Sequence, residues 1–144
     1  MKRHPALIAL SRDHHHALVM ARRLRRATPE DAAGAAQAFL EHWAEEEQAH
    51  FRIEEDILLP AYAAHGEVDH PAVVRALLDH VLIRCDAARL DDPPSLEALH
   101  DLGARLADHV ELEERELFPL IEQTLPEDAL AALGEQLRDA AGHR

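Results

Sequence analysis

Two stretches of the chain share the pattern His-x-x-x-Glu-Glu-x-x-Leu-x-Pro, and residues of these types could bind a metal. The first stretch covers residues 50–60 and the second covers residues 109–119. Residues four apart lie one turn apart on the same face of a helix, so each histidine and the glutamate that follows it can reach one metal region. Imidazole and carboxylate together suit non-haem iron. The ligands that this repeat predicts are His50, Glu54, His109 and Glu113.

A shorter repeat supplies one histidine to each of two other helical segments. Leu-Ser-Arg-Asp-His at residues 10–14 parallels Ala-Leu-Leu-Asp-His at residues 76–80. Both histidines, His14 and His80, interrupt apolar residues at helical spacing, which predicts that they face a core. A buried imidazole or carboxylate is costly unless a hydrogen bond or a cation compensates it. We therefore expect these two histidines to join the four residues of the first repeat around bound cations.

The first of these histidines belongs to a run of three, His14-His15-His16, of which only one can face the core. Successive helical residues point about 100° apart. His14 lies in the register of the apolar residues around it, whereas His15 shares a face with Ser11 and Arg22. We favour His14, with His15 as the alternative, and expect His16 on the surface.

Turn signals divide the chain into four long helices and a shorter tail. Thr28-Pro29-Glu30-Asp31 predicts a helix start, with a threonine cap, a proline in the first turn and acidic residues near the helix N-terminus. Further breaks fall at residues 65–71, 91–95 and 125–128. The predicted helices cover about residues 5–26, 29–64, the segment from 71 to 90, and 95–124, with a last helix ending near residue 140. Short loops make consecutive helices antiparallel, so we expect an all-α, up-down-up-down four-helix bundle with an additional short C-terminal helix.

Apolar residues recur at helical spacing in every segment and predict its buried face. The tail helix has its own stripe and is expected to pack on the outside of the bundle. The inward positions that we expect are Leu7, Leu10, Leu18, Ala21 and Leu24 in the first helix; Phe39, Trp43, Ile57, Leu58 and Ala61 in the second; Val73, Leu77, Val81 and Ala87 in the third; Leu99, Leu102, Leu106, Leu117 and Leu120 in the fourth; and Leu130, Leu133 and Leu137 in the tail.

Length and composition fit a single helical domain spanning residues 1–144. The chain is 47% hydrophobic, which allows a substantial core, and it has only 3% aromatic residues and five glycines, a balance that favours helices. Its formal net charge of −13 argues against nucleic acid as a partner, because phosphate binding needs a basic patch.

The expected location is the cytoplasm. A single cysteine, Cys85, can form neither an intrachain disulfide nor a thiolate zinc cage, which suits a reducing interior. The apolar run after the basic first residues is too short for a secretory signal, and no stretch approaches membrane-spanning length. We expect a soluble protein without a membrane partner, either monomeric or a homodimer.

The paired motifs ending in Leu-Leu-Pro and Leu-Phe-Pro, with a lone histidine on each of the other two helices, resemble the hemerythrin-like domains called HHE cation-binding domains. The resemblance covers about residues 7–125. It implies two non-haem iron ions, bridged by two carboxylates and an oxo or hydroxo group, with zinc or manganese as alternative metals. Carried over by position, His14 and His50 would bind one iron and His80 and His109 the other, while Glu54 and Glu113 would bridge them.

The sequence departs from the pattern of oxygen-carrying hemerythrins, which have five histidines with two spaced by four on the third helix. Here the residues four away from His80 are Ala76 and Arg84. The missing ligand argues against reversible oxygen storage and favours redox chemistry, turnover or a different small ligand.

Several other polar residues have a surface interpretation and a functional one. Glu55 and Glu114 follow the predicted bridging glutamates and are more often solvated charges, although such residues can orient ligand imidazoles. His42 and Glu46 precede His50 at spacings of four. A surface face is the favoured interpretation for them, and a polar channel is the alternative.

The function that we expect is a small diiron protein that binds dioxygen, nitric oxide or peroxide for sensing, scavenging or iron handling. A peroxide-consuming oxidoreductase is one alternative, and a structural or regulatory module holding zinc or manganese is another. A protein that binds a metal and a small ligand is favoured over a dedicated enzyme.

Overall fold

The part of the chain that the structure describes forms five helices joined by short turns. The structure is a computed structural model that describes residues 2–142, and within that range every regular element is helical. Two of the helices contain π-helical turns and a third begins with a 3-10 turn. Each of these three helices is continuous through the irregular turns. In chain order the elements are η1 (Pro5–Leu7) and α1 (Ile8–Arg25); α2 (Ala32–His42), η2 (Trp43–Glu47), α3 (Gln48–Ile53), η3 (Glu54–Leu58) and α4 (Leu59–Ala63); α5 (Pro71–Ala88); α6 (Leu96–Leu112), η4 (Glu113–Leu117) and α7 (Phe118–Thr124); and α8 (Glu127–Ala141).

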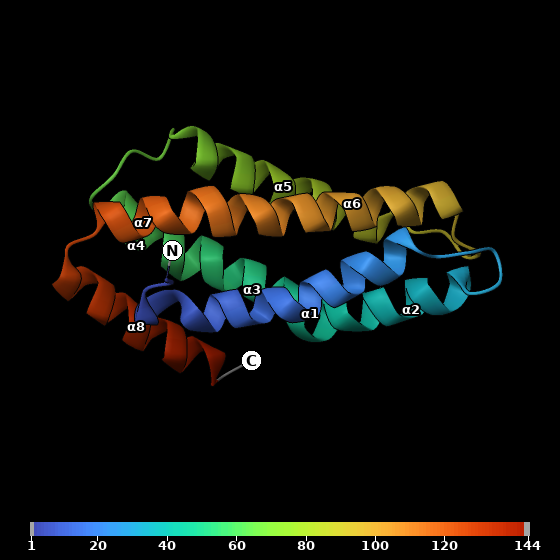
Figure 1. Cartoon of the computed structure of the whole chain (residues 1–144), viewed down its shortest axis with the longest axis horizontal. Coiled ribbons are helices and arrows are strands. Elements are labelled where there is room, and N and C mark those ends of the chain that lie inside the picture. The colour runs from blue at the N-terminus through green and yellow to red at the C-terminus, as the bar shows by residue number, and fades with distance from the viewer. Residues whose placement is uncertain (1, 143–144) are drawn as a thin grey trace.

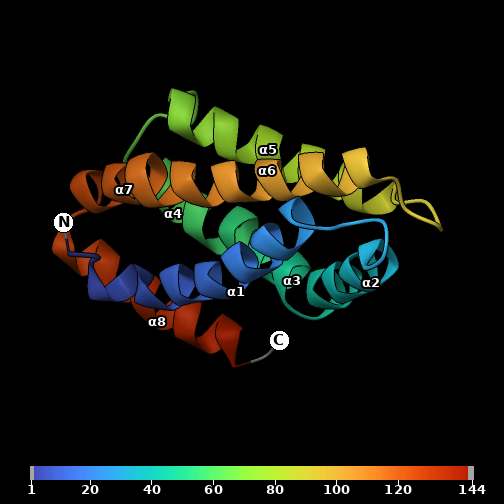
Figure 2. The same cartoon turned by 45° about the vertical axis from the view of Figure 1, so that its right-hand side comes forward.

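The first four helices alternate in direction, as predicted. Figure 1 shows α1 running one way, α2 to α4 returning, α5 running forward again and α6 to α7 returning. Among the first four helices, α1 and α6 share the most extensive contact, followed by α5 and α6. The expectation of an all-α bundle with an extra C-terminal helix is confirmed. Figures 1 and 2 both place α8 beside the N-terminal half of α1, where its stripe of Leu130, Leu133 and Leu137 is buried.

Side-chain caps set most of the helix starts. Ser95 accepts a hydrogen bond from the Ala98 N–H at the start of α6, and His70 accepts one from the Ala72 N–H at the start of α5. The prediction of a helix start at residue 29 was wrong by three residues. The Asp31 carboxylate accepts from the Thr28 N–H at 2.6 Å and holds residues 28–31 in a turn, so α2 begins at residue 32.

Two of the three π-helical turns carry a Glu-Glu pair at their start and are followed by a proline. In η3 the Leu59 N–H bonds back five residues to the Glu54 carbonyl, and in η4 the Phe118 N–H bonds to the Glu113 carbonyl in the same way. A proline at residue 60 or 119 has no N–H, and its ring crowds the carbonyl four residues earlier, which favours the wider turn. π-Helical turns often occur at functional sites.

The apolar core consists of two clusters separated by a polar layer. One cluster contains Leu7, Leu10, Phe118 and the leucines of α8, and the other contains Ala17, Phe39 and Leu106. On α1 and α5 a single predicted ligand, His14 or His80, lies between the residues of the two clusters, and on the other two of these helices the boundary falls between the ligand histidine and the ligand glutamate. The bundle therefore holds a layer of polar side chains between two apolar clusters.

Three of the predicted core positions were wrong. Leu18 is 42% exposed, Leu77 is 39% exposed and Val81 is 54% exposed. In α1 the buried stripe passes through Ala17 in place of Leu18. The third helix, α5, is apolar on two faces, and its inner face is Val73, Ala76, His80, Ile83 and Ala87.

Gly103 permits the close approach of α6 to α1. A Cβ atom at this position would lie 2.7 Å from the Ala21 carbonyl oxygen and 2.9 Å from the Leu24 Cβ. Neither of those atoms belongs to the end of a flexible side chain, so no side chain larger than hydrogen fits without moving a helix. Among the described residues, none of the helices combines the length and apolar character needed to span a membrane.

Candidate metal centre

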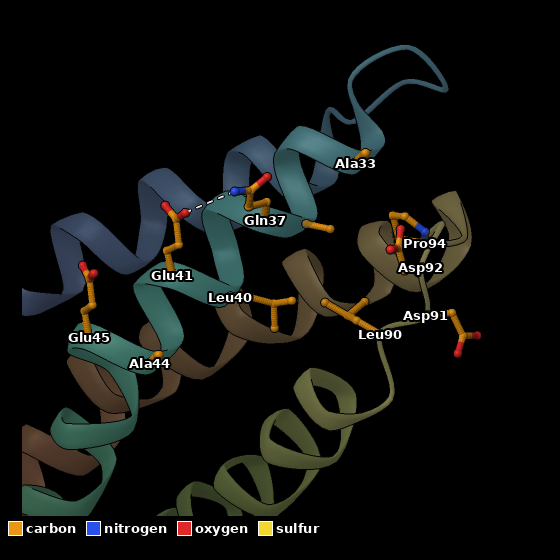
Figure 3. A pocket seen from close by; sticks show the side chains of 11 residues that line it. Ala33, Gln37, Leu40, Glu41, Ala44, Glu45, Leu90, Asp91, Asp92 and Pro94 are labelled. Carbon is orange, nitrogen blue, oxygen red and sulfur yellow. Dashed lines mark hydrogen bonds between the residues drawn. The ribbon is translucent and has the colours of Figure 1, made fainter.

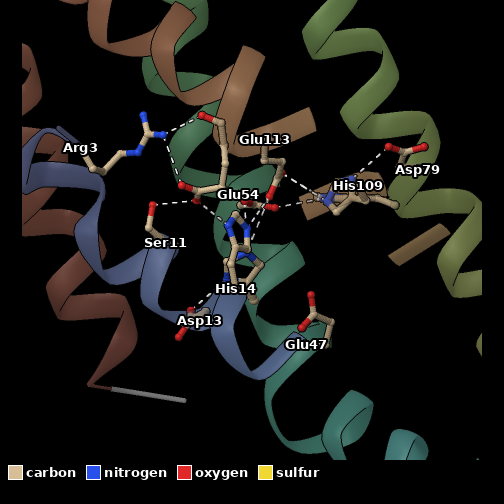
Figure 4. A network of polar contacts seen from close by, with 12 residues as sticks. Arg3, Ser11, Asp13, His14, Glu47, Glu54, Asp79, His109 and Glu113 are labelled. Atoms are coloured by element: carbon tan, nitrogen blue, oxygen red, sulfur yellow. Dashed lines mark hydrogen bonds and ion pairs between the residues drawn. The ribbon is translucent and has the colours of Figure 1, made fainter. Parts of the chain in front are cut away.

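The structure brings the six predicted ligands together in the polar layer. His14 comes from α1, His80 from α5, and each of the other two helices supplies one histidine and one glutamate. All six side chains are buried, and the most exposed residue, His14, is only 3% exposed. Figure 4 shows His14, Glu54, His109 and Glu113 pointing toward one another from three helices. We call these six residues the metal centre, and their role as metal ligands stays a prediction that is taken up below.

The ligand atoms form two overlapping groups, as a dinuclear site requires. In each group, one atom from each of four residues lies within 4.8 Å of all the others. Both groups include Glu54 and Glu113, so these two carboxylates lie between two candidate cation positions. The groups are His14, His50, Glu54 and Glu113, and His80, His109, Glu54 and Glu113.

Each imidazole points its Nε2 atom at one of the two shared carboxylates. The arrangement has an approximate twofold symmetry, because the helix pair α1 and α2–α4 repeats the contacts of the pair α5 and α6–α7. The distances from Nε2 to the nearest carboxylate oxygen are 2.9 Å for His14 to Glu113, 3.0 Å for His80 to Glu54, 3.2 Å for His50 to Glu54 and 3.4 Å for His109 to Glu113.

The opposite ring nitrogen, Nδ1, of every one of these histidines donates to a second carboxylate. We call these four acids the outer carboxylates. Each lies on a different helix from the histidine that it contacts, so it fixes the ring from across a helix interface. The pairs and their distances are His14 with Glu114 at 2.6 Å, His50 with Asp13 at 2.9 Å, His80 with Glu55 at 2.6 Å and His109 with Asp79 at 3.1 Å.

The outer glutamates are in turn held by arginines. Arg84 donates to both oxygens of Glu55 at 2.7 and 3.1 Å and lies 5.6 Å from the centre of the Phe51 ring, which stacks on His80. Arg84 stands four residues after His80, where sequence reasoning noted the lack of a second histidine. This position therefore carries a residue that fixes the orientation of a histidine's partner.

An equivalent clamp holds the other glutamate. Arg3 donates to the Glu114 carbonyl at 2.7 Å and to its carboxylate at 3.3 Å. It also lies 5.3 Å from the centre of the Phe118 ring, which stacks on His14. Figure 4 shows Arg3 approaching the metal centre from the N-terminal segment.

Carboxylates raise the pKa of the buried histidines. Burial alone would lower the pKa of His14, but hydrogen bonds to Glu113 and Glu114 outweigh it and raise the value to about 9. The pKa of His80 is also raised to about 9, because Glu113 and Glu54 overcome the same effect of burial.

The remaining two imidazoles behave in the same way. Against the effect of burial, the charge of Glu113 and the hydrogen bond to Asp79 raise the pKa of His109 to about 10. The pKa of His50 is raised well above its ordinary value, and that of Glu113 is held well below its ordinary value by the histidines around it. A cation that binds these imidazoles must displace their protons, since only the neutral ring is a ligand.

Several atoms of the metal centre lack a hydrogen bond although they are buried. Among the described residues they include both carboxylate oxygens of Glu54 and Oε2 of Glu113. Three of the four histidines, His50, His80 and His109, likewise have no hydrogen bond at their Nε2 atoms. Buried polar atoms without partners are costly and uncommon, and two cations, one in each ligand group, would satisfy them. The donor set, four imidazoles and two shared carboxylates, therefore fits two transition-metal ions.

Comparison with known proteins agrees with this geometry. Residues 6–121 match the model of the hemerythrin HHE cation binding domain, which is most of the chain. The chain belongs to the HHE family. No similar protein was found among the curated proteins, and none among the solved structures. The resemblance that the sequence motifs indicated is thereby confirmed for the HHE domain as a whole.

The structure also decides between the alternatives for neighbouring residues. In the run of three histidines, His14 is buried, whereas His15 and His16 are exposed. Glu55 and Glu114 were expected to be solvated charges on the surface. That interpretation was wrong, because each of them contacts a histidine and an arginine. It was also wrong for His42, which is only 8% exposed.

A surface pocket of about 550 Å³ lies between α2 and the loop of residues 89–95 (Figure 3). Figure 3 shows alanine side chains, Leu40 and Leu90 along its walls, with acidic side chains at its rim. None of the six residues of the metal centre lines it. The pocket is therefore separate from the HHE cation site.

Proposed function

We propose that this HHE domain is a diiron protein that binds dioxygen, nitric oxide or peroxide for sensing, scavenging or iron handling. The observation that carries the proposal is the pair of overlapping ligand groups that share Glu54 and Glu113. Iron suits the mixed imidazole and carboxylate donors, and when bound it supplies open coordination positions and reversible one-electron chemistry. A separate role as a dedicated enzyme is not part of the proposal.

The residues of the chain orient the donor atoms before a metal arrives. Each outer carboxylate accepts the Nδ1 proton of one imidazole, which leaves Nε2 to face the cation and makes it a stronger donor. The two apolar clusters exclude water from both sides of the polar layer. Two imidazoles and two shared carboxylates per cation leave room for a small exogenous ligand.

Metal analysis of protein purified without a chelating tag tests the proposal. We expect two irons per chain, with a visible charge-transfer absorption that changes when the reduced protein meets dioxygen, nitric oxide or peroxide. Zinc or manganese in place of iron, with no such absorption, would support the structural or regulatory alternative.

A matched pair of variants tests whether the shared carboxylate matters. Glu113→Gln keeps the size of the side chain and removes the charge that both cations need, so we expect fewer than two irons per chain. Glu116→Gln lies in the same helical turn on an exposed position and should leave the iron content unchanged. Equal iron content in both variants would contradict the assignment of Glu113.

A further inference from the structure

Among the described residues, the exposed large apolar side chains are concentrated on α5 and on the loop before it. Val74 is 51% exposed, Leu77 is 39% exposed, and Leu78 and Val81 are each 54% exposed. In the loop, Val68 is 61% exposed. Apolar residues that are scattered singly over a surface need no explanation, but a contiguous patch marks an interaction site. We call the four residues on the helix the α5 face.

The α5 face points away from the bundle. Spacings of three, one and three residues keep its four side chains within about 100° of one another around the helix. His80 and Ile83 are buried on the opposite side of the same helix. Figures 1 and 2 both place α5 along the upper edge of the bundle, and no other element within residues 2–142 lies beyond it. The described part of the chain therefore leaves this face uncovered.

The order of residues along the α5 face makes it complementary to itself. Val-x-x-Leu-Leu-x-x-Val, at residues 74–81, reads the same in both directions. In an antiparallel pair of α5 helices, with a twofold axis between Leu77 and Leu78, Val74 of one copy meets Val81 of the other and Leu77 meets Leu78. An interface on a twofold axis uses the same patch of both copies, so each contact occurs twice.

The charges at the two ends of α5 fit the same antiparallel arrangement. Glu67 and Asp69 precede the helix and are exposed. Arg89 follows the helix, is also exposed, and lies eleven residues after Leu78, which is three turns and therefore the same side. Antiparallel pairing brings Arg89 of each copy to the acidic end of the other copy.

The local charge of α5 also permits two copies to approach. The chain as a whole has a formal net charge of −13, which opposes self-association. Residues 71–89, in contrast, contain three arginines and two aspartates. Acidic repulsion is therefore weak where the α5 face meets a second copy.

We propose that the α5 face binds the α5 face of a second copy and forms a twofold, antiparallel dimer. The helix has 18 residues and is about 27 Å long. Two such helices, extended at each end by Val68, bury less than the roughly 800 Å² per partner of a standard interface, so the dissociation constant is on the order of 10 µM. The inference goes beyond the proposed function, because the face lies on the side of α5 opposite to the metal centre.

Analytical ultracentrifugation of the metal-loaded protein, from about 1 µM to about 1 mM, measures the association. We expect a reversible monomer–dimer equilibrium. The double variant Leu78→Gln with Val81→Gln replaces apolar contacts by amides that lose their hydration in the interface, so the dissociation constant should rise by at least about tenfold. Both positions are exposed and glutamine is a good helix former, so the fold should be kept.

The matched control is the double variant Leu18→Gln with Val19→Gln. These residues are 42% and 62% exposed, and they lie on α1, outside the α5 face. The control removes the same two residue types from comparable exposure, and it should dimerise like the unaltered protein. Iron content should be the same in both double variants and in the unaltered protein.

Disulfide cross-linking tests the direction of the two helices. In protein carrying Cys85→Ser, the variants Val74→Cys and Val81→Cys are prepared separately and oxidised with oxidised glutathione. Packed helices have axes about 8–10 Å apart, which brings facing Cα atoms within the reach of a disulfide. A mixture of the two variants should form a disulfide-linked dimer, whereas each variant alone should form little.

The outcomes separate this proposal from the diiron proposal. A protein that stays monomeric up to about 1 mM, or equal dimerisation of the two double variants, would overturn the interface. Cross-linking of each cysteine variant with itself in preference to the mixture would overturn the antiparallel arrangement. A protein that dimerises through the α5 face but binds no iron would defeat the proposed function and leave the dimer standing.

Discussion

Each buried histidine of the metal centre uses its two ring nitrogens for different tasks. Nδ1 contacts an outer carboxylate, and Nε2 faces the shared glutamates Glu54 and Glu113. An outer carboxylate fixes both the tautomer and the orientation of the ring, and it makes the ring a stronger donor. The metal affinity of this HHE domain should therefore depend on residues that never touch the metal.

Asp79→Asn tests that dependence. The amide keeps the size of the side chain but loses the charge that accepts the Nδ1 proton of His109, so we expect metal affinity to fall by roughly 10–100-fold. Competition with a chelator of known affinity measures the change. Asp108→Asn, an exposed neighbour of His109 with no such contact, is the control and should bind metal like the unaltered protein. Equal affinities in the two variants would show that the outer contact is irrelevant.

Sequence reasoning identified the six central residues but not two of the outer carboxylates. Asp13 and Asp79 stand next to His14 and His80 in the half-repeat that revealed those histidines. Neighbouring residues point about 100° apart on a helix, so neither aspartate reaches its own neighbour. Each reaches a histidine on another helix, and such a contact depends on helix packing that spacing along one chain does not contain.

At the scale of the helices, close contact between α1 and α6 keeps opposite sides of the metal centre in register. Gly103 makes this contact possible, because a Cβ there would lie 2.7 Å from the Ala21 carbonyl oxygen. Packing at this position therefore couples helix spacing to the geometry of the site.

Gly103→Ala should destabilise the protein. A gain of about 1 kcal/mol in helix propensity is expected from alanine, but the clash with a backbone oxygen costs more, and overpacking of this kind costs about 1–3 kcal/mol. Gly34→Ala is the matched control, since its nearest neighbour would be the Arg23 guanidinium at 3.6 Å, and this variant should be slightly stabilised. Unfolding by denaturant measures both, and a stabilised Gly103→Ala would contradict the packing argument.

Element type was predictable from the sequence, while the buried face of one helix was not. Helix ends fell within about three residues of the predicted positions, because caps and prolines mark them. In α5, apolar residues cover both faces, so periodicity could not distinguish the inner Val73 and Ile83 from the exposed Leu77 and Val81. The π-helical turns were not predicted: the prolines at residues 60 and 119 favour two of them, but η2 has no such proline, and helical periodicity alone does not distinguish a π turn from an α turn.

The whole molecule combines two apolar clusters with a layer of buried charge between them. The clusters supply the burial that stabilises the bundle, and the layer opposes it unless its charges are matched. Protons and metal cations can both match the carboxylates. The stability of the molecule should therefore respond to pH in opposite ways with and without metal.

Without metal, the unfolding free energy should fall as pH rises from about 7 to about 10. The folded protein holds protons on His14, His80 and His109 with pKa values of about 9, 9 and 10, against an ordinary value of 6.5. Their contribution is complete below pH 6.5 and is lost as pH rises through the folded values.

With metal, the slope should reverse, because only neutral imidazoles bind the cation and protons compete with it as pH falls. Denaturant unfolding of the stripped and the metal-loaded protein at pH 7 and pH 9 compares the two slopes. Slopes of the same sign would mean that the imidazoles of the metal centre are not the cation's ligands.

The most direct test of the account is anomalous diffraction at the iron edge from crystals of the iron-loaded protein. The account predicts two anomalous peaks between Glu54 and Glu113, one beside His14 and His50 and the other beside His80 and His109. A single peak, a peak outside the polar layer, or no peak at all would contradict it.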